Sequence, residues 1–137
     1  MMKKLLSFVA AGTALAVGST AAQAETRQER AEARLADLIE GRTAGEPQTC
    51  VTAYRSNDIE VIPYVGIIYD AGDTIYVARA KRPERLRSTD VPVIERFGSQ
   101  LCSTDVMRTI DRHAGFTTGA LFLEDFVPYT KVEEADG

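Results

Sequence analysis

The stretch that decides the fold is VGIIYDAGDTIYVA, at Val65–Ala78. β-Branched and aromatic residues fill both of its halves, 65–69 and 74–78, and residues of these types favour strands. Between the halves lies Asp70-Ala71-Gly72-Asp73, a composition typical of a tight turn. The sequence therefore predicts a β-hairpin at this point.

Further segments with the composition of strands lie on both sides of this hairpin. Upstream are Cys50–Tyr54 and Ile59–Ile62. Downstream are Val91–Phe97 and the apolar stretch Ala120–Tyr129, whereas 101–111 fits either a strand or a single helical turn. We therefore expect an antiparallel sheet of about five or six strands, either open or curled into a half-barrel.

An amphipathic helix is predicted before these strands, at residues 26–40. Thr26 and Glu29 have the spacing of a capping box, in which each side chain bonds the other residue's backbone N–H. Apolar residues then recur at helical spacing, at Ala31, Leu35, Leu38 and Ile39. Gly41 is a natural end to the helix, and 41–47 is expected to be a linker.

The predicted fold class is therefore α+β, with one N-terminal amphipathic helix, a small antiparallel sheet or half-barrel and one disulfide. The expected divisions are a signal peptide at 1–24, the helix and linker at 25–47 and a β-rich domain at 48–130. Residues 131–137 are expected to be an acidic, disordered tail.

The composition fits one globular domain. The chain has 137 residues, of which 45% are hydrophobic and 26% charged. Its net charge of −4 argues against a dedicated nucleic-acid-binding protein, which would usually be basic. The glycine-rich motifs that hold nucleotide phosphates are missing from the sequence, and neither a cofactor nor a metal ion is predicted.

The first 24 residues have the three parts of a secretory signal peptide. Lys3 and Lys4 supply the basic start, and Leu5–Val17 is the apolar segment. Ala22 and Ala24 are the small residues that signal peptidase requires, so cleavage is predicted after Ala24. The apolar segment is shorter than the roughly 20 residues of a membrane-spanning helix. The sequence therefore predicts export from a bacterial cytoplasm, to the periplasm or outside the cell.

Cys50 and Cys102 are the only cysteines, and both lie in the part expected to be exported. In an oxidising compartment such a pair is expected to form a structural disulfide, although a bridge between two chains is an alternative. A redox pair would usually show C-x-x-C spacing, and a zinc site would need more ligands than one histidine and two cysteines supply.

A basic stretch stands out from this acidic chain. It places five cations within nine positions, at Arg79, Lys81, Arg82, Arg85 and Arg87. Such a stretch can bind a phosphate, a carboxylate or an acidic polymer. It can also be a solvated loop, or a charged edge strand that prevents aggregation. These five residues are the predicted binding surface.

A Ser-His-Asp or Cys-His mechanism would have to use His113, the single histidine, as its base, whereas a pair of carboxylates for glycoside hydrolysis stays open among the twenty acidic residues. The weak candidates for its partners are Ser103 and either Asp111 or Asp105, which would make a small hydrolase. Neither the G-x-S-x-G motif nor any other catalytic signature surrounds the serine. A secreted inhibitor with an exposed loop at 81–90 is a further alternative.

Three short motifs resemble an uncharacterised family of small exported proteins of Gram-negative bacteria. They are Cys50-Val51, Asp73-Thr74-Ile75 and Leu101-Cys102-Ser103-Thr104-Asp105, and the similarity spans 49–129. Members of that family often carry another cysteine near the position of the basic stretch, which is absent here. The resemblance implies export and a small β-rich domain, and it implies no catalytic residue.

The leading functional hypothesis is a non-enzymatic, exported binding domain. Its expected partner is an anionic component of the cell envelope or another protein, rather than nucleic acid. Without residues 1–24 the chain keeps 14 basic and 20 acidic residues, a net charge of −6, so the basic stretch contrasts with its surroundings even more strongly.

Overall fold

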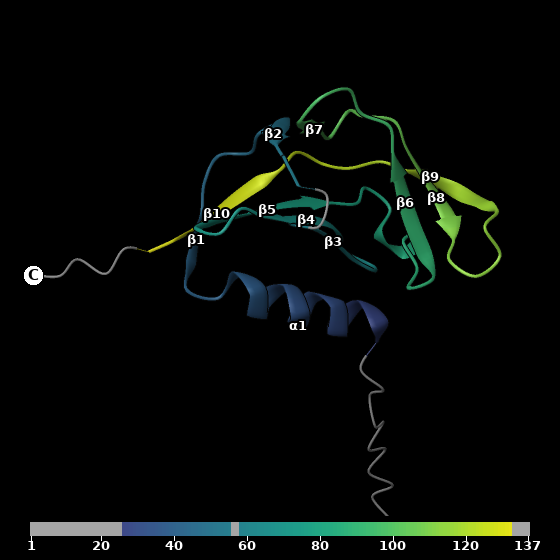
Figure 1. Ribbon diagram of the computed structural model, residues 1–137. Coiled ribbons are helices and arrows are strands. Elements are labelled where there is room, and N and C mark those ends of the chain that lie inside the picture. Colours follow the sequence, from purple (N-terminus) through teal and green to yellow (C-terminus); the bar gives the residue numbers. More distant parts are fainter. Residues whose placement is uncertain (1–25, 56–57, 133–137) are drawn as a thin grey trace, which may run out of the picture.

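The computed structural model describes residues 26–55 and 58–132, and Figure 1 shows their arrangement. The predicted signal peptide and its cleavage position lie outside these residues, as does 133–137 of the expected tail. Within the described part there is one α-helix, α1 (Arg27–Ile39), and the other regular elements are antiparallel strands and one short 3-10 helix, η2 (Pro83–Arg85). The α+β class is confirmed.

Three antiparallel sheets contain the ten strands of the described residues. The largest has the order β1-β10-β5-β4-β3, formed by β1 (Arg42–Ala44), β10 (Val127–Lys131), β5 (Thr74–Arg79), β4 (Gly66–Asp70) and β3 (Ile59–Ile62). A second sheet pairs β2 (Cys50–Thr52) with β7 (Gln100–Cys102). The third has the order β6-β8-β9, formed by β6 (Asp90–Ile94), β8 (Met107–Asp111) and β9 (Thr117–Leu121).

The expectation of one sheet with about five or six strands was wrong, because short strands were missed and the chain divides them among separate sheets. Arg42–Ala44, expected as part of a linker, pairs with β10 instead. The ambiguous segment 101–111 supplies strand β8 and part of β7. Lys131, expected at the start of a disordered tail, is the last residue of β10 and lies opposite Arg42.

The predicted hairpin is confirmed as β4 and β5, the centre of the large sheet, and it is buried on both faces. Alternate residues point to opposite sides of a strand. Ile68 and Val77 therefore lie in one apolar cluster, whereas Ile67 and Ala78 lie in another. This two-sided burial explains why the hairpin sequence is apolar throughout.

The helix covers one face of the large sheet, and the two small sheets lie on its other side and at one end (Figure 1). The capping box is confirmed, since Thr26 Oγ1 accepts from the Glu29 N–H at 3.1 Å and Glu29 Oε2 accepts from the Thr26 N–H at 2.8 Å. Ala31 and Leu35 are buried against the sheet. The helix therefore packs through the stripe that the sequence predicts.

Gly66 is the position where the central hairpin leaves no room for a side chain. A Cβ atom on this residue would lie 2.0 Å from the carbonyl oxygen of Ala78 on the neighbouring strand. Backbone atoms cannot move aside as the end of a flexible side chain can, so the glycine is a steric requirement of the close approach between β4 and β5.

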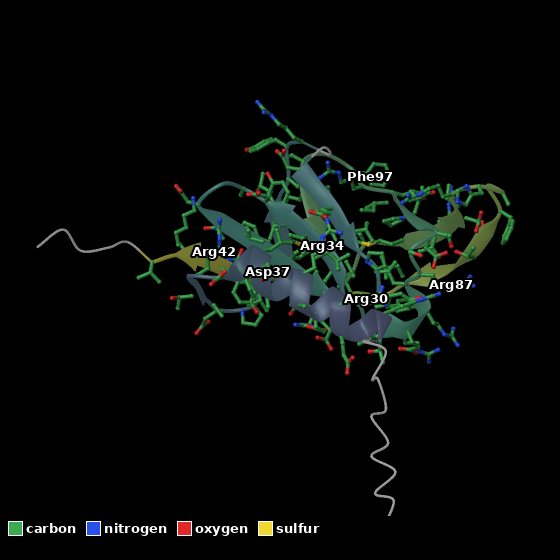
Figure 2. The ribbon with its side chains drawn as sticks, turned by 90° about the horizontal axis from the view of Figure 1, so that it is seen from below. Arg30, Arg34, Asp37, Arg42, Arg87 and Phe97 are labelled. Carbon is green, nitrogen blue, oxygen red and sulfur yellow. A yellow bond between two sulfur atoms is a disulfide. The ribbon has the colours of Figure 1, made fainter. Side chains whose placement is uncertain are left out.

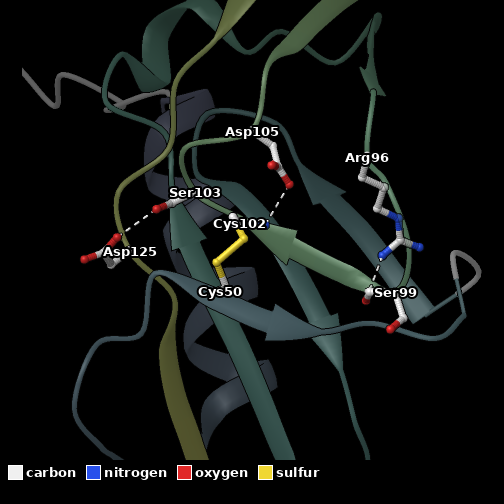
Figure 3. Close-up of a disulfide and its surroundings, with 7 residues drawn as sticks. All are labelled: Cys50, Arg96, Ser99, Cys102, Ser103, Asp105 and Asp125. Atoms are coloured by element: carbon white, nitrogen blue, oxygen red, sulfur yellow. Dashed lines mark hydrogen bonds between the residues drawn. A yellow bond between two sulfur atoms is a disulfide. The ribbon is translucent and has the colours of Figure 1, made fainter.

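The predicted disulfide joins Cys50 to Cys102 within one chain. The two residues face each other directly in the β2–β7 pair. Figure 3 shows that Asp105 closes the turn after β7, where its carboxylate accepts from the Cys102 N–H at 2.8 Å. The Leu-Cys-x-x-Asp motif is thus a turn that supports the disulfide.

Candidate functional site

The structure separates the five cations of the basic stretch. Arg79 lies on the helix side of the large sheet, where its guanidinium donates to both carboxylate oxygens of Glu32, at 2.7 and 3.1 Å. The hydrogen bonds from Arg79 hold the pKa of the Glu32 carboxyl below its ordinary value. This pair joins α1 to β5, so Arg79 has a structural partner already.

Lys81 lies beside a different set of side chains. It lines a hollow of about 560 Å³ together with three carboxylates, those of Asp105, Glu124 and Asp125. The exposed ring of Phe122 borders the same hollow. Lys81 therefore stands among acidic groups, and it does not share a surface with Arg79.

The remaining cations, Arg82, Arg85 and Arg87, form what we call the arginine surface. They lie on and around η2, between the large sheet and the β8–β9 hairpin. Arg82 and Arg85 line one hollow with Thr109 and Phe122, and Arg85 and Arg87 line a second with Thr109. Arg85 belongs to both hollows, so the arginine surface is continuous.

Arg82 and Arg85 are exposed, and they form no ion pair with any carboxylate of residues 26–55 and 58–132. Guanidinium groups bind carboxylates and phosphates through paired, charge-assisted hydrogen bonds. In the view of Figure 2, Arg87 lies at the end of the molecule opposite Arg42. The arginine surface is therefore a local feature of one end of the domain.

The segment that carries the arginine surface is anchored at its centre. Leu86 is buried, with 1% of its surface exposed, and its carbonyl oxygen accepts from the Tyr64 N–H at 2.8 Å. The carbonyl oxygen of Tyr64 in turn accepts from Gln28 of α1 at 2.9 Å. The exposed arginines thus project from a fixed backbone, which reduces the entropy lost when a ligand binds.

Asp90 fixes the other end of the same segment. This buried carboxylate accepts from the Arg87 N–H at 2.8 Å and from the Thr118 hydroxyl at 2.9 Å. The Thr118 hydroxyl also lies 2.7 Å from Thr109 Oγ1. Because Thr118 has one hydroxyl proton and gives it to the carboxylate, Thr109 is the donor in this second contact. The network ties the arginine surface to strand β9.

The structure does not bring the catalytic candidates together. Ser103 comes before β8, and its hydroxyl donates to Asp125 at 2.7 Å (Figure 3), whereas His113 comes after β8, in the turn to β9. The strand between them is about 13 Å long at 3.3 Å per residue. Ser103 therefore has a carboxylate partner, but His113 is at the other end of the strand from it.

Asp111 and Asp105 both hold turns. The Asp111 carboxylate accepts from the N–H groups of Ala114 and His113, at 2.8 and 2.9 Å, and these bonds lower the pKa of the Asp111 carboxyl. Asp105 accepts from Cys102 as described above. These contacts resemble the Asx turns in which aspartate commonly stabilises a loop.

The segment proposed as an inhibitor loop, 81–90, is held by Leu86 and Asp90, and the disulfide lies elsewhere, between β2 and β7. Within 26–55 and 58–132, no three or more His, Cys, Asp or Glu side chains are grouped so as to hold a metal ion. The one α-helix of those residues is too short and too polar to cross a membrane.

No protein-family model, curated protein or solved structure matches this chain. The resemblance to exported Gram-negative proteins thus rests on the three short motifs alone. One of them, Leu101–Asp105, has a structural explanation in the turn beside the disulfide.

Sequence reasoning identified the arginines but missed Asp90 and Thr118, which position them. The two residues are 28 positions apart, and neither belongs to a recognisable motif. A single acidic residue just after a basic stretch was the one available signal, and it fits an ordinary surface loop equally well.

Proposed function

We propose that the chain is an exported, non-enzymatic binding domain that holds anionic groups of its partner at the arginine surface. The observation that carries this proposal is the pair Arg82 and Arg85, which are exposed and have no carboxylate partner among the described residues. On a mature chain of net charge −6 most of the surface repels anions, so local cations without partners favour a specific contact.

Rigid anchoring supports the same proposal. The backbone beneath the arginines is held by Leu86, Tyr64 and Asp90, whereas a segment that merely keeps the protein soluble needs no such support. Two neighbouring threonines, Thr109 and Thr118, line the hollow beside Arg85 and Arg87, and their hydroxyls are hydrogen-bonded to each other. The surface therefore combines fixed geometry with positive charge.

Export to the periplasm or the medium is part of the proposal. It is supported by the three-part N-terminal sequence and by the disulfide, since disulfides persist mainly in oxidising compartments. Expression of the full chain in a Gram-negative host tests it. The periplasmic or secreted protein should have the intact mass of a chain that begins at Glu25 with its disulfide formed, and a cytoplasmic chain that keeps Met1 would contradict it.

Binding is tested with two anionic polymers, polyglutamate and polyphosphate, which carry carboxylates and phosphates respectively. We expect at least one of them to bind, more weakly as the salt concentration rises. The double variant R82A/R85A should weaken that binding by about tenfold or more, because charge-assisted bonds are lost.

A matched control is the double variant R55A/K131A, which removes the same number of charges from exposed positions elsewhere. It should reduce binding far less than R82A/R85A. An equal loss in both variants would mean that only net charge matters, and it would overturn the proposed arginine surface. Failure of both polymers to bind at low salt would overturn the proposed function.

A further inference from the structure

Strand β9 is an edge strand whose pairing with β8 is regular except for one register shift, between Thr109 and Ile110. It is the outer strand of the order β6-β8-β9, and among the described residues none pairs with its free side. Its sequence, Thr-Thr-Gly-Ala-Leu, has neither a charge nor a proline. An unprotected edge offers its backbone N–H and C=O groups to another strand.

The other outer strands of the larger sheets differ from β9 in this respect. The opposite edge, β6, carries Asp90 and Pro92. In the large sheet, β3 carries Glu60, which pairs with Arg34 of α1, and β1 carries Arg42 and is three residues long. Within the part of the chain that the structure describes, β9 is thus the five-residue edge that lacks a protecting residue.

A row of hollows follows β9 and the residues after it. The hollow with Arg85 and Arg87 is lined by Thr118, Gly119 and Ala120, and the hollow with Arg82 by Ala120 and Phe122. Gly119 and Ala120 are exposed, so small side chains leave the strand open to an approaching backbone. Thr109 of β8 lines both hollows as well, so the row lies over the face of the β8–β9 pair, with the arginine surface as its other wall.

We propose that β9 accepts an extended, acidic polypeptide segment as an additional strand, with the carboxylates of that segment on the arginine surface. This inference rests on the proposed function and names the class of partner. A peptide in strand conformation satisfies the free backbone groups of an edge, and its alternate side chains then point to the same side. A polysaccharide or a polyphosphate has no backbone amides to do so.

Charge complementarity selects an acidic segment. Side chains two residues apart on an added strand are separated by about 6.6 Å and point to the same side, so an acidic segment can present several carboxylates to the arginine surface. The Asp90–Thr118 bond holds the arginine segment and β9 in a fixed relation, so that the two halves of the site are formed before binding. The geometry thus favours alternating acidic and apolar residues in the partner.

The probe is an eight-residue peptide of alternating valine and glutamate, with two variants. One carries N-methyl groups on alternate backbone amides, and the other has lysine in place of glutamate. The unmodified peptide should bind, with the backbone amides of Thr117–Leu121 protected from hydrogen exchange. N-methylation on the edge-facing side should weaken binding by about tenfold or more, because ladder hydrogen bonds are lost. Two N-methylated peptides are made, one for each set of alternate amides, because only one set faces the edge of β9. The peptide with lysine in place of glutamate should not bind.

The outcomes separate this inference from the function on which it rests. One outcome would overturn strand addition and leave the arginine surface in place. In that outcome, binding of polyglutamate or polyphosphate depends on Arg82 and Arg85, but neither N-methylated peptide binds more weakly than the unmodified peptide. If the wild-type protein binds neither the polymers nor the peptide, both strand addition and the proposed function are overturned. Protection of β3 or β6 amides, in place of those of β9, would also overturn the inference.

Discussion

The carboxylate of Asp90 accepts a hydrogen bond from the hydroxyl of Thr118 at 2.9 Å and so connects the two outer strands of the three-stranded sheet across β8. The second oxygen of the same carboxylate holds the Arg87 N–H. One buried acidic group thereby fixes both the backbone of the arginine surface and the strand beside it. The contact therefore positions the candidate site, whereas the arginines supply its charge.

Replacing Asp90 by alanine should destabilise the domain by roughly 2 kcal/mol, since it removes charge-assisted bonds and leaves buried donors without a partner. Thr118→Val, which keeps the shape and removes the hydroxyl, should cost about 1 kcal/mol. Thr130→Val is the control, because its hydroxyl bond to Thr74 is exposed. Urea denaturation measures all three, and an equal effect of T118V and T130V would contradict this role.

Gly66→Ala should be among the most destabilising single substitutions in the large sheet, at about 3 kcal/mol or enough to prevent folding. The added methyl group would meet the Ala78 carbonyl at 2.0 Å, and strained overpacking of this kind usually costs 1–3 kcal/mol or more. Gly119→Ala provides the comparison, because the nearest atom to its added Cβ is 3.8 Å away. If both variants show the same thermal midpoint, the close approach of β4 and β5 is not as described.

Removing the disulfide by the double substitution C50S/C102S should lower the free energy of unfolding by about 4 kcal/mol on the chain-entropy estimate. The bridge closes a loop with a sequence separation of 52, which restricts the unfolded chain considerably. Denaturation with and without a reducing agent measures the effect in the native sequence. The C50S/C102S variant should be insensitive to the reductant, and unchanged wild-type stability under reduction would contradict the estimate.

The Glu32–Arg79 pair should make the attachment of the helix depend on pH. The folded-state pKa of Glu32 is lowered, so its stabilising contribution is present above the ordinary value of 4.5 and declines as the pH falls through the lowered folded value. Both side chains are about 40% exposed, so the contribution at neutral pH should be below about 1 kcal/mol.

A double-mutant cycle with E32Q and R79M measures this coupling, by urea denaturation at a series of pH values. The coupling should stabilise the folded state at pH 7, and its magnitude should decrease as the pH falls below 4.5. As a control, E32Q combined with Arg112→Met should show no coupling, and neither should R79M combined with Arg112→Met. A Glu32–Arg79 coupling that grows on acidification would contradict the assignment.

The central hairpin, the helix and the disulfide were predictable because each has a local signal. Residues 65–78 combine strand-forming residues with a turn, and Thr26 and Glu29 form a capping box as their spacing predicts. The division into three sheets was not predictable, since β2 and β7 are three residues long and pair across some 50 positions. Such pairing is decided by tertiary packing, which the local pattern does not contain.

The candidate site was predictable only in part, for the same reason. Charge density located the five cations, but the alternation along β5 directs Arg79 toward α1, and the turn beyond it directs Lys81 toward the acidic hollow. Strand β9 was not predicted at Thr117–Gly119, because glycine lies within this segment and is uncommon in strands. Pairing with β8 overrides that local preference.

The most direct measurement of the central claim is a backbone amide spectrum of the isotope-labelled protein titrated with polyglutamate. The account predicts that the largest shift changes fall on 82–87 and 117–121, the two sides of the proposed site. Changes confined to α1 or to the β1 end of the large sheet would contradict it, as would a spectrum left unaltered at low salt by polyglutamate and by polyphosphate alike.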